Sequence, residues 1–96
     1  MNHIVNRESE GMRSFSSASY TIANELEDVC SHLKQELYTA NSYMQDASGQ
    51  AALTIVSELV EETMVAVAHI RSIAEKIKKS AELLEESDTL LGEGSG

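Results

Sequence analysis

The 96-residue chain carries a formal net charge of −9, because 16 aspartates and glutamates outnumber seven lysines and arginines. This acidic balance argues against nucleic acid as a ligand, since phosphate contacts need a basic face. Hydrophobic residues make up 42% of the chain, enough for a core, but proline and tryptophan are absent and aromatic residues reach only 4%. A β-sandwich or barrel needs many turns and β-branched or aromatic strands, so the composition favours an all-α fold.

The positions of the glycines divide the chain. They stand at 11, 49, 92, 94 and 96, so that residues 12–48 and 50–91 contain none. Two long segments around one glycine predict an antiparallel two-helix hairpin. We expect residues 1–17 to be a flexible N-terminal segment, residues 18–90 to form the hairpin with its turn at 47–49, and residues 91–96 to be a disordered tail.

The first helix is expected over residues 18–46, where apolar side chains recur every three or four residues. Ile22, Leu33 and Met44 are spaced by eleven residues, and so are Leu26 and Leu37. Eleven residues make three turns of an α-helix, so this spacing predicts a stripe that runs nearly straight along the helix. At one position of the stripe the pattern leaves either Val29 or Cys30 as the inward residue.

The tripeptide Ala47-Ser48-Gly49 interrupts this pattern. Gly49 can adopt the positive φ that ends a helix, and Ser48 can cap the next one. The second helix is expected over residues 50–90. Its main apolar stripe, which we expect to face the first helix, runs through Val56, Leu59, Thr63, Ala66, Ile70, Ile73, Ile77, Ala81 and Leu84.

A second apolar stripe lies beside the main one and predicts a partner. It comprises Leu53, Val60, Met64 and Val67, and a two-helix hairpin has only one seam in which to bury apolar surface. We therefore expect association into a four-helix bundle, as a homodimer or with another helical chain. The predicted partner interface consists of Ile22, Leu26, Leu33, Leu37, Leu53, Val56, Val60, Met64 and Val67.

No pattern of catalytic or metal-binding residues stands out. His3, His32 and His69 form no HxxxH or HExxH pair, and the single Cys30 excludes both a CxxC pair and an intrachain disulfide. The expectation is a protein without catalytic residues, metal or cofactor, in which Cys30 is a small buried hydrophobic side chain.

The sequence also bears on localisation. No run approaches the ~20 apolar residues of a membrane span. The first residues, MNHIVNRESEG, lack the apolar region of a Sec-type signal peptide. We expect a cytoplasmic protein, or one that is secreted without a Sec signal peptide.

The residues Ala47-Ser48-Gly49-Gln50-Ala51-Ala52 resemble the turn of the small Trp-X-Gly (WXG) proteins of bacterial type VII secretion. In that family the tripeptide joins two helices and is commonly followed by alanines. The resemblance covers residues from about 18 to 90, and the size and acidic balance are also similar. Ala47 stands where the family has tryptophan.

The family also carries an export motif, Tyr-x-x-x-Asp/Glu, just after its second helix. Leu84 and Asp88 have this spacing, with leucine in place of the tyrosine. Both parts of the family's signal therefore depart from its pattern. This is similar to the helical partners of LXG toxins, which pair with the toxin's N-terminal helical region. The resemblance implies a non-enzymatic adaptor that pairs with itself or with a toxin, and that supports export through the secretion machinery.

Two other functions are compatible with a helical hairpin. One is a subunit or secretion chaperone of another helical complex, such as a type III needle-like subunit. The turn of such subunits usually contains proline, which this chain lacks. The other is an enzyme or metal-binding bundle, which would need inward-facing Glu and His three residues apart. Neither apolar stripe contains that pair.

Overall fold

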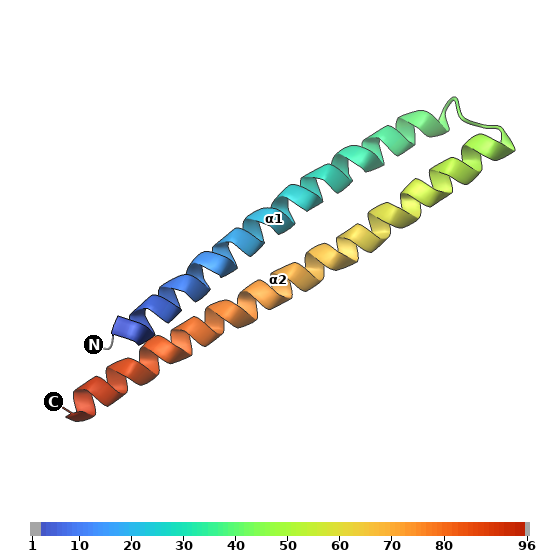
Figure 1. Ribbon diagram of the computed structural model, residues 1–96. Helices are drawn as coiled ribbons and strands as arrows, with labels where there is room; N and C mark the ends of the chain where they lie inside the picture. The colour runs from blue at the N-terminus through green and yellow to red at the C-terminus, as the bar shows by residue number, and fades with distance from the viewer. Residues whose placement is uncertain (1–2, 96) are drawn as a thin grey trace. The chain divides into compact units, whose positions relative to one another are not determined.

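The computed structural model describes the backbone of residues 3–95 and the side chains of residues 4–89. It contains two α-helices, α1 (His3–Asn41, 39 residues) and α2 (Ala47–Ser95, 49 residues), which run antiparallel and are joined by a short connection (Figure 1). Residues 3–95 include no strand. The predicted all-α two-helix hairpin is therefore confirmed.

The N-terminal segment is helical, so the expectation of a flexible segment over residues 1–17 is wrong from His3 onwards. Two of its serines turn inward: Ser9 and Ser16 are 0% and 3% exposed, and Ser16 Oγ donates a 2.8 Å hydrogen bond to the Ala74 carbonyl of α2. A segment of low intrinsic helix propensity is helical here because tertiary packing against α2 holds it. The part of α2 that this segment packs against, which includes Ile77 and Leu84, therefore has a helical partner within the chain.

The expected disordered tail at 91–96 is also contradicted, since α2 continues to Ser95; Gly96 lies outside the described residues. Glycine costs only about 1 kcal/mol relative to alanine inside a helix. Each added residue of an existing helix gains one hydrogen bond without a new nucleation cost. With no proline to stop it, α2 can propagate through the glycines.

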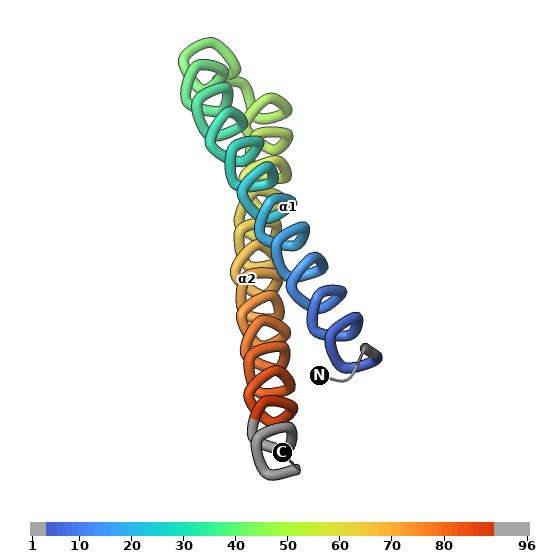
Figure 2. The backbone as a smooth tube through the Cα atoms, turned by 90° about the vertical axis from the view of Figure 1, so that its left-hand side faces the viewer, coloured from blue at the N-terminus to red at the C-terminus, as the bar shows by residue number. Residues whose placement is uncertain are grey.

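The connection spans residues 42–46, not the expected 47–49. At its start, the backbone amides of Tyr43 and Met44 both donate to the Ala40 carbonyl, at 3.1 and 2.8 Å. Figure 2 shows the two helix ends meeting at this connection (in green). Gly49 does not have a positive φ, because it belongs to the first turn of α2 and not to the end of α1.

Asp46 explains why α2 begins at Ala47. Its Oδ1 accepts a 2.9 Å hydrogen bond from the Gly49 amide, and its carbonyl accepts one from the Gln50 amide, also at 2.9 Å. This is the geometry of an N-cap, in which a side-chain oxygen satisfies an amide of the first turn that has no partner within the helix. Ser48, expected to be the cap, lies inside the helix.

The connection passes close to position 49, where glycine leaves room for it. A Cβ atom there would lie 2.6 Å from Asp46 Oδ1, 3.1 Å from Met44 Cβ and 3.2 Å from the Met44 carbonyl oxygen. Within the tripeptide, Gly49 therefore serves this connection by leaving space for the Asp46 cap, and not through a positive φ.

The chain divides into two compact units. The terminal unit contains Met1–Thr21 and Ile70–Gly96, and the turn unit contains Ile22–His69. In the terminal unit the fully buried side chains are small: Ser9 and Ser16 of α1, and Ala74 and Ala81 of α2. In the turn unit they are Ala23, Cys30, Val60 and Val67.

The buried residues follow a seven-residue spacing within each helix. They are Ser9, Ser16, Ala23 and Cys30 in α1, and Val60, Val67, Ala74 and Ala81 in α2. Seven residues over two turns is the heptad repeat of helices that pair as a left-handed coiled coil. Half-buried residues three positions further on, such as Leu33 and Ile70, complete the pattern. We call this set of inward positions the seam.

The seam corrects the eleven-residue stripe expected for the first helix. Ile22 is 51% and Val29 53% exposed, whereas their neighbours Ala23 and Cys30 are 0% and 1% exposed. An eleven-residue stripe is straight on an isolated helix, but paired helices coil slightly to stay in contact and then repeat every seven residues. The prediction of a buried Cys30 is confirmed.

Candidate interaction interface

The heptad register places the side chains next to the seam on two opposite sides of the paired helices. We label the buried residues of the seam a and the half-buried residues three positions later d. The flanking positions are then g, one residue before a, and e, four residues after a. In antiparallel helices the e positions of both face one side, and the g positions face the other. Arg13 and Glu85 both occupy e positions, and a direct ion pair joins them. We call the e side the polar side and the g side the apolar side, for the residues described next.

On the polar side of the terminal unit, charged and hydroxyl groups join the two helices. Arg13 donates to both carboxylate oxygens of Glu85, from Nε at 2.9 Å and from Nη2 at 2.6 Å. These hydrogen bonds lower the pKa of Glu85 to about 2. Nearby, the Tyr20 hydroxyl donates to Glu75 at 2.6 Å. This bond raises the pKa of Tyr20 and lowers that of Glu75.

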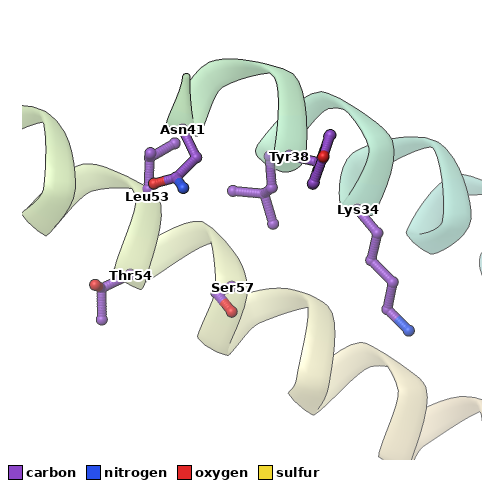
Figure 3. Close-up of a pocket in the computed structure, with 7 residues that line it drawn as sticks. Lys34, Tyr38, Asn41, Leu53, Thr54 and Ser57 are labelled. Carbon is purple, nitrogen blue, oxygen red and sulfur yellow. The ribbon is translucent and has the colours of Figure 1, made fainter. Parts of the chain in front are cut away.

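The polar side of the turn unit is also hydrophilic. A shallow pocket there is lined by Lys34, Leu37, Tyr38 and Asn41 from α1, and by Leu53, Thr54 and Ser57 from α2. Figure 3 shows Lys34 extending from α1 on the side where Ser57 of α2 also lies. Tyr38 is 86% exposed. The pocket has no arrangement of acid, base or nucleophile that would indicate catalysis.

The apolar side of the turn unit carries large hydrophobic side chains in solvent. Ile22 and Val29 of α1 occupy g positions, as does Leu59 of α2, and they are 51%, 53% and 54% exposed. Ile55, on the outer edge of the same side, is 67% exposed. Adjoining them is a small pocket lined by Leu33, Glu36, Leu37, Ala40, Leu53 and Val56. Large apolar side chains that are exposed along one side of a helix pair are candidates for an interaction site.

The apolar side of the terminal unit has the same character. Phe15 and Ile73, both at g positions, are 60% and 53% exposed. Phe15 also lines an open groove with Gly11, Met12, Ile77 and Ser80. Because Gly11 has no side chain and nothing lies within 4 Å of where a Cβ would be, the groove is open beside the Phe15 ring.

The predicted interface residues fall into two groups. Eight of the nine belong to the seam or its edge within the chain, and Ile22 alone is exposed. The eight are Leu26, Leu33, Leu37, Leu53, Val56, Val60, Met64 and Val67. Val60 and Val67, assigned above to a partner, are 2% and 1% exposed in the single chain. Leu59 and Ile73, assigned to the first helix, are instead available to a partner.

The Leu84 and Asp88 pair of the expected export motif lies along the seam. Both side chains are half-buried. Asp88 lines a pocket with Val5, Asn6, Ser9, Glu85 and Thr89, so it faces the N-terminal part of α1.

The described residues contain no group of three His, Cys, Asp or Glu side chains that could hold a metal ion. Over the same residues, neither helix is apolar over a sufficient length to cross a membrane. The histidines with described side chains, His32 and His69, are exposed.

Sequence reasoning missed Phe15 because its segment was expected to be flexible, and it placed Leu59 in the main apolar stripe, although Leu59 is 54% exposed and its neighbour Val60 only 2%. The signal that separates them is present in the sequence. Small residues at Ser9, Ser16, Ala23 and Cys30 are seven apart and mark the close contact between helices, which leaves Phe15, Ile22 and Val29 one position earlier and outside it.

No protein-family model matches the chain, and neither the curated proteins nor the solved structures contain a significant match.

Proposed function

We propose that this chain is a non-enzymatic helical pairing protein that uses its apolar side to bind another helical chain. The observation that carries the proposal is the contrast between the two sides of the seam. Leu59 and Val29 are more than half exposed on one side, whereas charged and hydroxyl groups line the other. Ordinary solvation accounts for the polar side, but it gives no reason for a row of large apolar side chains.

The mechanism of pairing follows from the heptad register. The seam is already filled within the chain, so a partner would leave it intact and lie along the g positions. Two further helices placed there would bury Ile22, Val29 and Leu59 in the centre of a four-helix bundle. Burial of apolar area contributes about 25 cal/mol per Å², and this is the driving force of the proposed association.

Within this class, we propose a partner or adaptor of bacterial type VII secretion, which pairs with itself or with the N-terminal helical domain of an LXG-like toxin. Support comes from the resemblance around Ala47-Ser48-Gly49 and the following alanines, together with the two-helix architecture. The tripeptide begins α2, and the Leu84 and Asp88 pair is half-buried. Presentation of a bound toxin, and not an exposed motif of this chain, is therefore the proposed route to the secretion machinery.

Co-expression with proteins encoded by adjacent genes tests this function. We expect a helical, toxin-like protein to copurify with the wild-type chain and with Tyr38→Glu, a control on the polar side. Leu59→Glu, on the apolar side, should lose it. Circular dichroism of both variants checks that the hairpin is intact. If no partner copurifies and sedimentation shows a monomer at all concentrations, the pairing function is refuted. A partner that is bound but not exported refutes only the secretion role.

A further inference from the structure

The charges around the apolar side of the turn unit indicate what kind of helix it fits. Glu36 occupies a g position, and Glu25 and Glu62 lie two residues after the buried Ala23 and Val60, at what are called c positions on the same side. All three glutamates are exposed. They form what we call the acidic rim.

No cation offsets the acidic rim on this side. Residues 22–69 contain eight acidic residues and one basic residue, a formal charge of −7. The single basic residue, Lys34, occupies an e position and lines the pocket on the polar side. His32 and His69 are not included in this formal charge. The apolar residues of the turn unit are thus bordered by one sign of charge.

From this acidic rim we infer that the turn unit docks an amphipathic helix of a different protein, whose apolar stripe is flanked by lysine or arginine. This rests on the proposed pairing function and names the chemistry of the partner. Opposite charges beside an apolar contact steer association and select partners, as e and g charges do in coiled coils. A lysine- or arginine-flanked helix meets the acidic rim with opposite charge at each border of the contact.

A second copy of this chain fits the same surface poorly. Residues 22–69 carry a formal charge of −7, and the residues of the terminal unit carry −2, from eight acidic and six basic residues. Whichever unit of a second copy faced the acidic rim, its net charge would be negative. Like charges across an interface disfavour that pairing.

Sedimentation of the full chain with a charge-reversed copy of itself tests the inference. The copy carries Glu25→Lys, Glu36→Lys and Glu62→Lys, which keep every apolar side chain and change only the sign of the rim. We expect wild type alone to remain monomeric at micromolar concentration and the mixture to form a heterodimer. The dissociation constant of the mixed pair should be about tenfold or more below that of either protein with itself.

Two further measurements decide the cause of any association. Raising NaCl from 0.1 to 1 M shortens the screening length from about 10 to 3 Å, and should weaken the mixed pair towards the self-association of wild type. Leu59→Glu in the wild-type chain should abolish the mixed pair, whereas the control Tyr38→Glu should leave it unchanged.

A wild-type homodimer as tight as the mixed pair, or the absence of a mixed pair, overturns the inference. A homodimer that Leu59→Glu disrupts would still support the proposed pairing function, with a second copy as the occupant. If Leu59→Glu does not weaken the mixed pair, the proposed docking site is not on the apolar side. The failures of the two proposals are therefore distinguishable.

Discussion

The seam can be tested with two valines that stand two residues apart in α2. Val67 is 1% exposed and lies in the seam, whereas Val65 is 56% exposed and points away from it. The substitutions Val67→Ala and Val65→Ala make the same chemical change in the same helix. Differences in helix propensity therefore cancel between them, and only burial distinguishes their effects.

The magnitude follows from the groups removed. Loss of two buried methyl-sized groups at Val67 costs about 1.6 kcal/mol at ~0.8 kcal/mol each, and the cavity left behind adds to it. Alanine regains roughly 0.5 kcal/mol through its higher helix propensity. We expect Val67→Ala to lower the free energy of unfolding by about 1–2 kcal/mol, and Val65→Ala to change it by less than about 0.5 kcal/mol in either direction.

Thermal unfolding followed by circular dichroism measures this difference. A change of 1 kcal/mol shifts Tm by about 4–8 °C in a domain of this size, so the two variants should differ by roughly 6–12 °C. Equal shifts for Val67→Ala and Val65→Ala would refute the heptad seam. A larger loss for Val65→Ala would indicate that the outward face of α2 is the one buried in solution.

Three further predictions concern the ends and sides of the hairpin. Gly49→Ala should lower the free energy of unfolding, because the new Cβ would lie 2.6 Å from Asp46 Oδ1. This loss should be smaller in a chain that also carries Asp46→Ala, and a double-mutant cycle of unfolding free energies measures the difference. The Arg13 hydrogen bonds lower the Glu85 pKa from 4.5 to about 2. The stabilisation that they provide is therefore complete above pH 4.5 and is lost as the pH falls to 2. The Tm difference between wild type and Glu85→Gln should vanish over this range, and a difference that stays constant would contradict the prediction. Ser16→Leu should overpack the contact with the Ala74 carbonyl and cost about 1–3 kcal/mol in urea unfolding. The control Ser17→Leu changes an exposed neighbour and should cost less than about 0.5 kcal/mol; equal losses for the two variants would contradict the buried contact.

Much of the fold could be predicted from residue types alone. The absence of proline and the glycine-free segments are enough to predict two helices, since nothing between them breaks the backbone hydrogen bonds. The order of the helices and their antiparallel pairing follow from the short connection. Asp46 was overlooked as the N-cap, although an aspartate before a helix is a strong starting signal. Reading it would have placed the start of α2 correctly.

The candidate interface was less predictable because adjacent residues compete for the same position. Val29 and Cys30, or Leu59 and Val60, are neighbours of similar polarity, and a change of one residue rotates the helix by about 100°. Whether the spacing is eleven or seven then decides which of the two faces the other helix. Composition does not contain this information.

By itself, the sequence determined that the chain is helical, that it folds back once near Gly49, and that it has more apolar surface than one seam can bury. Only the tertiary structure decided where that surplus lies. Pairing makes the two helices coil with a seven-residue repeat, which draws Val60 and Val67 inward and leaves Val29 and Leu59 in solvent. Pairing with α2 also keeps the serine-rich start of α1 helical. Its Ser16, for example, donates a hydrogen bond to the carbonyl of Ala74, which is 58 residues away in the sequence.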